Sequence, residues 1–189
     1  MANKCTKPLK IEQLTNVVDH LDNQTRVITL LLMKATRVGD LLNVLRITDV
    51  YHESGSIKPE LVYHEGKTGK LRVIPLVGDR LLNSLRSLWD TDLCNREYSK
   101  STHLFYSRKR KPLCTITVNR RLQNFVGEWG IEEISTHAIR KTAARNMLDN
   151  GARIEHISEM MNHSDVKTTR TYLQINNDDV IKAYAYLEI

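Results

Sequence analysis

Apolar residues at helical spacing run through most of this 189-residue chain, and that periodicity limits the fold classes open to it. The pattern gives way between residues 46 and 76, where short strand-like segments alternate with Gly-containing turn sequences. We expect three strands there, at residues 46–51, 60–64 and 70–76. The sequence therefore predicts an α+β fold, mainly α-helical, with a small three-stranded antiparallel sheet near residues 46–76.

The helices are expected on both sides of this sheet, where apolar periodicity and capping residues mark them. They are predicted at residues 11–20, 24–36, 40–45, 79–89, 116–126, from Ser135-Thr136 onward, 154–161 and from Asp165 to about 173. A short extended piece is expected at residues 103–106. A last helix should begin at Asn177-Asp178 and present Val180, Ile181, Tyr184 and Leu187 on its apolar face. The length suits one domain that covers residues 1–189.

The positive charge of the chain is concentrated in one window. Residues 95–121 contain eight lysines and arginines against one acidic residue, a net +7, whereas the whole chain carries +6. A basic stripe on a nearly neutral body indicates a polyanion as partner, although a charge run by itself is more often a solvated face. The candidate contact residues in this window are Arg108, Lys109, Arg110, Lys111, Arg120 and Arg121.

The same composition argues against several other classes of protein. The three cysteines are widely spaced and form no zinc-binding pattern with the histidines, which predicts free thiols in a reducing compartment and no structural metal. The longest apolar run, residues 27–33, is far too short to cross a bilayer. No apolar segment of a signal peptide begins the sequence. We therefore expect a cytoplasmic protein without a membrane segment.

Four polar residues in the C-terminal half form an ordered set. His137 and Arg140 stand three residues apart, so a helix presents both on one face. His163 follows within Asn162-His163-Ser164, and Tyr172 comes nine residues later. This order resembles the C-terminal signature of the tyrosine recombinases of the phage integrase family, which reads His-x-x-Arg, Gly-His-Ser/Thr and then Tyr. Asn162 replaces the family glycine, but Asn tolerates left-handed backbone angles, so the turn should survive.

The resemblance extends upstream and covers nearly the whole chain in the family's order. Residues 35–42, Ala-Thr-Arg-Val-Gly-Asp-Leu-Leu, look like the first family box, although Ala35-Thr36 depart from its usual glycine and apolar residue. Residues 66–76, Gly-Lys-Thr-Gly-Lys-Leu-Arg-Val-Ile-Pro-Leu, look like the β-hairpin that carries the family lysine. One such box would be a weak signal, whereas four in sequence are specific.

The resemblance implies a role for each matching residue. Tyr172 is expected to be the nucleophile that attacks a DNA phosphate, and Arg37 and Arg140 to bind its oxygens, for which a guanidinium is suited. His163 would add a hydrogen-bond donor, and His137 would act as the base. A lysine would protonate the departing 5′-oxygen. Lys67 is the preferred residue for this step, and Lys70 is the alternative. If Lys67 is the acid, Lys70 is expected to contact DNA. Asp40 would orient the arginine or its helix.

The family also suggests partners and rival functions. Double-stranded DNA would be the substrate, four protomers would assemble on it, and the last helix would pack in cis or in trans. Neither a metal nor another cofactor is expected. The N-terminal DNA-clamping domain common in the family is expected to be absent or trimmed. Two alternatives stay open at this point: a type IB topoisomerase, which reseals the same strand, and a non-catalytic DNA-binding regulator.

Overall fold

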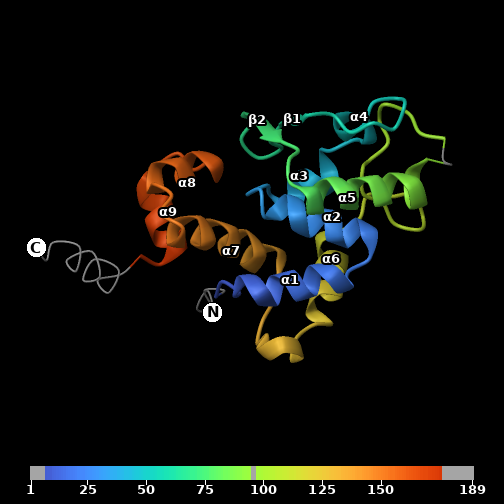
Figure 1. Ribbon diagram of the computed structural model, residues 1–189. Coiled ribbons are helices and arrows are strands. Elements are labelled where there is room, and N and C mark those ends of the chain that lie inside the picture. The colour runs from blue at the N-terminus through green and yellow to red at the C-terminus, as the bar shows by residue number, and fades with distance from the viewer. Residues whose placement is uncertain (1–6, 95–96, 176–189) are drawn as a thin grey trace, which may run out of the picture.

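The computed structural model describes residues 7–94 and 97–175. Figure 1 shows a mainly helical molecule in which the last three helices gather on one side and a small β-hairpin lies at one edge. In chain order the elements are helices α1 (Ile11–His20), α2 (Asn23–Leu32), α3 (Val38–Asn43) and α4 (Ile47–Val50), strands β1 (Glu60–His64) and β2 (Leu71–Pro75), helix α5 (Asp79–Leu88), the π-helical turn η1 (Trp89–Leu93), helix α6 (Thr115–Gln123), the 3-10 turn η2 (Glu128–Gly130), and helices α7 (Thr136–Asp149), α8 (Ile154–Met160) and α9 (Val166–Leu173).

Helices α7 and α9 begin where capping residues predicted them. The Ser135 hydroxyl accepts a 3.1 Å hydrogen bond from the Ala138 N–H and starts α7. The Asp165 carboxylate accepts a 2.9 Å bond from the Lys167 N–H and starts α9. Each cap satisfies a backbone donor that the first turn of a helix leaves without an internal partner. These two boundaries matter because α7 and α9 carry three of the candidate catalytic residues.

The sheet is smaller than predicted. Within the described residues it contains two antiparallel strands, β1 and β2, with Val62 opposite Val73. The third predicted strand, residues 46–51, is wrong, because Ile47–Val50 form the single-turn helix α4. The Asp49 carboxylate accepts a 2.7 Å hydrogen bond from the Arg46 N–H and closes this turn. The β-branched residues that suggested a strand are instead buried three positions apart on one helical face.

Two other predicted segments have different outcomes. The extended piece at residues 103–106 forms isolated bridges, from His103 to Arg46 and from Tyr106 to Pro112, and no strand. The predicted last helix lies at residues 177–189, outside the described residues. None of the helices in residues 7–94 and 97–175 is long and apolar enough to span a membrane.

Buried apolar side chains fall into a large cluster and a small one. The large cluster joins α1, α2, α5 and α6 with the inner face of the hairpin. The small cluster packs Ala35 against residues of α7, α8 and α9 and the turn between the last two: Ala144, Ile157, Met161 and Leu173. The segment just before α3 is therefore held against the helices that carry the C-terminal candidate residues.

Candidate active site

All six residues that the sequence analysis assigned to catalysis line one pocket of about 310 Å3. They come from four separate parts of the chain, namely the start of α3, the β1–β2 turn, α7, and the segment from the end of α8 through α9. They are Arg37, Lys67, His137, Arg140, His163 and Tyr172. The structure brings the predicted set together, and the chemical role of each residue stays a prediction.

Tyr172 contacts both candidate histidines. Its ring is edge-on to that of His137, with centroids 5.1 Å apart and planes at 90°. The ring of His163 lies 5.6 Å from it at 72°. The next residue, Leu173, is buried in the small core cluster and fixes this part of α9. A phenol has an ordinary pKa of about 10, so a nucleophilic tyrosine needs a base or cations beside it, and this pocket contains both.

The two candidate arginines differ in exposure. Arg140 is 8% exposed, and its Nη2 donates a 2.7 Å hydrogen bond to the main-chain oxygen of Met161. Burial lowers the pKa of Arg140 from its ordinary value, and the positive charges of Arg37 and Arg72 lower it further. A guanidinium nevertheless stays charged in proteins. Arg37 precedes α3 and is half-buried at the pocket, so both cations can face a phosphate.

The surroundings of both histidines lower the pKa of each ring, which favours the neutral form. Partial burial lowers the pKa of His137 below 6.5, and the charges of Arg140 and Lys141 add to the effect. The pKa of His163 is lowered by burial and by the charges of Arg140 and Arg37. His163 Nδ1 lies 2.8 Å from the Thr169 hydroxyl, whose residue is fully buried. A neutral imidazole can accept a proton on one nitrogen and donate from the other, as the predicted roles require.

Two turns that carry site residues pass through left-handed backbone conformations. Asn162, just before His163, has φ +54°, which confirms the prediction that asparagine would keep this turn. Ala35 has φ +60° at the turn that leads into Arg37. A residue with a Cβ pays roughly 1–2 kcal/mol for this conformation. The family's usual glycine in this segment would avoid that cost.

Of the two hairpin lysines, Lys67 lines the pocket, and the exposed Lys70 follows it in the same turn. The turn is attached to α3 through Asp40, whose carboxylate accepts a 2.9 Å hydrogen bond from the Gly66 N–H. The Asp40 carboxylate therefore holds the lysine turn, and its expected effect on Arg37 or its helix stays a prediction. A carboxylate 4% exposed gains such a bond at the cost of its hydration.

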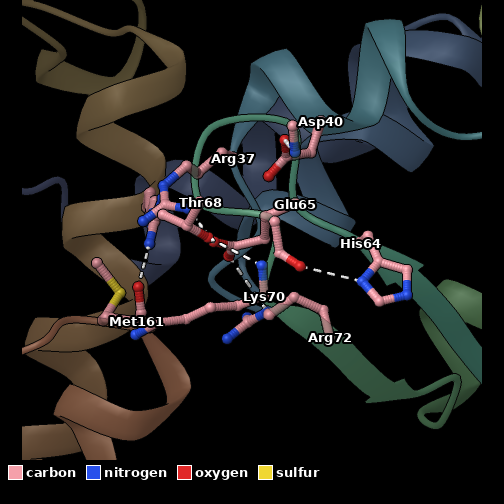
Figure 2. A network of polar contacts seen from close by, with 11 residues as sticks. Arg37, Asp40, His64, Glu65, Thr68, Lys70, Arg72 and Met161 are labelled. Atoms are coloured by element: carbon pink, nitrogen blue, oxygen red, sulfur yellow. Dashed lines mark hydrogen bonds and ion pairs between the residues drawn. The ribbon is translucent and has the colours of Figure 1, made fainter.

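A buried network that the sequence did not predict lies beside the pocket, as Figure 2 shows. Glu65 is 3% exposed and forms ion pairs with Arg37 and with Arg72, whose Nε lies 3.7 Å from Glu65 Oε1. The Thr68 hydroxyl donates a 2.6 Å hydrogen bond to Glu65 Oε2. Burial alone would raise the pKa of Glu65, but the neighbouring side chains of Asn162, Thr68 and Arg37 lower it overall. No local pattern marks an acidic residue in a turn as buried.

The basic window divides into two environments. Arg108, Lys109, Arg110 and Lys111 lie in an exposed loop, which the Ser107 N–H closes with a 2.8 Å hydrogen bond to the Lys111 carbonyl. Arg120 is exposed on α6. Its neighbour Arg121 has partners within the protein, because its Nη1 donates hydrogen bonds to the Asp22 carboxylate at 3.1 Å and to the Thr25 hydroxyl at 2.9 Å. The charges of the loop are therefore more available to a ligand than that of Arg121.

Among the side chains that the structure describes, no group of three or more His, Cys, Asp or Glu residues is placed to hold a metal ion. The described cysteines, Cys94 and Cys114, are free thiols.

Known proteins resemble the chain in sequence and in fold. A model of the phage integrase family matches residues 5–178. The probable integrase/recombinase YoeC of Bacillus subtilis (strain 168) is 31% identical over 151 residues, which cover 79% of this chain and 76% of that protein. Curated relatives named tyrosine recombinase XerC and XerD are longer, and the chain spans about half the length of these proteins.

Two solved structures have the same fold. The crystal structure of XerA recombinase superposes with a TM-score of 0.76 and 23% sequence identity. The match covers all of this chain and 66% of the XerA chain. The structure of XerH site-specific recombinase, bound to palindromic difH substrate in a post-cleavage complex, superposes with a TM-score of 0.71 and 20% sequence identity. The match covers 98% of this chain and 55% of the XerH chain. These relatives favour neither the topoisomerase nor the non-catalytic regulator. With the family model matching nearly its full length and the predicted residues gathered in one pocket, the chain belongs to the phage integrase family of tyrosine recombinases.

Proposed function

We propose that this domain performs the chemistry of a site-specific DNA recombinase, which cleaves and rejoins DNA strands through a 3′-phosphotyrosine on Tyr172. The observation that carries the proposal is the single pocket in which Tyr172 meets two arginines, two histidines and a lysine. That residue set is suited to attack on a phosphodiester, because it combines a nucleophile, a base, an acid and fixed cations.

The cleavage step can be written with each proton assigned. The Tyr172 oxygen attacks phosphorus while neutral His137, whose ring contacts that of Tyr172, takes the phenolic proton. A phosphotyrosine bond forms as the bond from phosphorus to the 5′-oxygen breaks. Lys67 donates a proton to this leaving oxygen, which departs as a 5′-hydroxyl. Attack by a 5′-hydroxyl of another strand reverses these steps and joins that strand.

The remaining residues of the pocket would stabilise the charge of the transition state. Arg37 and Arg140 donate to the non-bridging phosphate oxygens, and a guanidinium offers them bidentate hydrogen bonds. His163 donates from Nε2 when the Thr169 hydroxyl hydrogen-bonds to Nδ1. The phosphotyrosine conserves the energy of the broken bond, so in this proposal the reaction needs neither ATP nor a divalent metal.

The proposed substrate and partners follow from the charges and from the relatives. Double-stranded DNA would lie against the pocket and the basic loop, with phosphate contacts from Lys70, Arg120, Arg121 and the loop residues 108–111. XerH, which has the same fold, was solved on its DNA substrate, and this supports DNA as the ligand. We further propose a cytoplasmic tetramer on two duplexes, with residues 178–189 packed either in cis or on a neighbouring protomer. Their deletion should impair synapsis more than folding.

Covalent trapping tests the function directly. The protein would be mixed with a nicked suicide duplex from the flanks of its own gene, beside a Tyr172→Phe control. The expected result is a denaturation-resistant protein–DNA band that the control lacks. A band that persists in the control would assign the chemistry to another residue, and absence of a band on DNA that the protein binds would contradict the proposal.

A further inference from the structure

We infer that Glu65 is a positioning residue that holds the Lys67 turn and the Arg37 guanidinium in one fixed arrangement. This inference rests on the proposed function, because it concerns the same phosphate-cleaving pocket. Glu65 does not line that pocket, so its effect would pass through Lys67 and Arg37.

The burial of Glu65 requires the partners that surround it. A carboxylate with 3% of its surface exposed has lost its hydration, and such groups persist where charged and hydrogen-bonding partners replace the water. Arg37 and Thr68 both bond to its Oε2, and Arg72 faces its Oε1. These partners come from the start of α3, the hairpin turn and β2. One carboxylate therefore joins three segments around the pocket.

The main chain of Glu65 also closes the turn that carries Lys67. Its N–H donates a 2.9 Å hydrogen bond to the Lys70 carbonyl, and its carbonyl accepts a 2.8 Å bond from the Gly69 N–H. The side chain then fastens this closed turn to Arg37. The base of Lys67 is consequently set relative to Arg37, although its own side chain is exposed.

Arg37 can keep this contact while it binds a phosphate. A guanidinium has five N–H donors, and the ion pair with Glu65 engages Nη1. Its side chain is 25% exposed and lines the pocket, whereas that of Glu65 is 2% exposed. The carboxylate thus fixes the guanidinium from the protein side and leaves a side open to the ligand.

The geometry of the general acid explains why this would matter for rate. A displacement of about 1 Å in a catalytic group can cost roughly 100-fold. If the turn loosens, Lys67 misses the 5′-oxygen, but the affinity for DNA should not fall. Loss of the negative charge of Glu65 makes the pocket more positive, which favours phosphate binding. The signature of a positioning role is therefore slower cleavage at undiminished affinity.

The test compares two leaving groups. Single-turnover adduct formation would be measured on a nicked duplex with the ordinary 5′-oxygen and on one with a 5′-bridging sulfur at the scissile phosphate. A thiolate leaves without protonation, so sulfur bypasses the general acid. Glu65→Gln should cleave the oxygen substrate about 100-fold more slowly and recover on sulfur the part of this loss that comes from Lys67, whereas Lys67→Ala should recover most of the wild-type rate. The control is Glu60→Gln, an exposed acid on β1, which should cleave both substrates at the wild-type rate.

Each outcome decides between the possibilities. Wild-type rates of Glu65→Gln on both substrates, or an equal loss on both, overturn the positioning of Lys67. If Glu65→Gln does not fold, Thr68→Ala takes its place, because it removes the 2.6 Å hydrogen bond to Glu65 at an exposed position. A slower cleavage that sulfur restores supports the inference, and wild-type rates on both substrates overturn it. If wild-type protein forms no Tyr172 adduct, the proposed function itself fails and the inference fails with it.

Discussion

The rings of His137 and Tyr172 meet edge-on, with centroids 5.1 Å apart and planes at 90°. His137 follows the first residue of α7, whose start is fixed by the Ser135 cap, and Tyr172 lies near the end of α9. Two helices that α8 separates in the sequence thus bring a titratable ring against a phenol. Because burial and neighbouring cations lower the pKa of His137, this ring is neutral at physiological pH and can accept a proton.

This relationship predicts the pH dependence of cleavage. A base with a lowered pKa stays active as the pH falls to 6.5 and loses activity only as the pH drops through the lowered value. Single-turnover cleavage should therefore be level from pH 8 to about 6.5 and decline in more acidic buffer. An acid limb centred above 6.5 would contradict the assignment.

His137→Gln provides the matching variant. Loss of a positioned base costs about 10²–10⁴-fold, and the residual rate should rise with pH, because the phenol must then lose its proton to solvent. His156→Gln, at an exposed position on α8, should keep the wild-type profile. A His137→Gln profile parallel to that of the wild type would assign the acid limb to another group.

The two hairpin lysines should separate into a chemical and a binding role. Lys67 lines the pocket, so Lys67→Ala should slow cleavage of the oxygen substrate by about 10²–10⁴-fold with little change in DNA affinity. Lys70→Ala should bind more weakly, with a shallower salt dependence, and cleave at the wild-type rate once saturated. Gel-shift titrations paired with single-turnover rates measure both properties. The reverse pattern would make Lys70 the general acid.

The bond from the Gly66 N–H to the Asp40 carboxylate predicts a difference between two substitutions. Asp40→Ala leaves this partly buried donor without its acceptor, which costs about 1–3 kcal/mol. In a domain of this size that corresponds to a fall in Tm of roughly 2–12 °C. Asp40→Asn keeps an acceptor oxygen and should lose less. Thermal unfolding of both variants measures the difference, and equal Tm values would show that the bond does not hold the turn.

Helical periodicity, caps and motif order were sufficient to predict most helices and the six pocket residues, because each depends on neighbouring residues or on a family pattern. The strand expected at residues 46–51 was wrong because its β-branched residues favour a strand, but local capping closes a single helical turn there. The bond from Arg46 to Asp49 decided between them. A four-residue segment gives periodicity too little length to discriminate.

Glu65 could not be predicted for a different reason. Its ion-pair partners are 28 and seven residues away, and its burial depends on how the hairpin packs against α3. In the sequence it resembles any solvated acid beside a glycine turn. Only tertiary packing brings Glu65 to its partners. The same holds for Arg121, which the sequence pattern grouped with the candidate DNA contacts and which the fold places in a hydrogen bond to Asp22.

The exposed basic loop should account for part of the salt dependence of DNA binding. Each lost phosphate contact lowers the magnitude of the slope of log K against log salt by about 0.9. Lys109→Ala combined with Lys111→Ala should therefore reduce it by about 1.8 if both contact phosphate, and the affinity should fall on every sequence alike. Arg110 is better left unchanged, because its φ of +57° makes the loop conformation sensitive there. Arg121→Ala also removes a positive charge, but one that already bonds to Asp22, so the slope of log K against log salt should change less in this variant. A wild-type slope in the loop variant would mean that the loop faces away from DNA and that phosphate contacts come from the pocket and the hairpin.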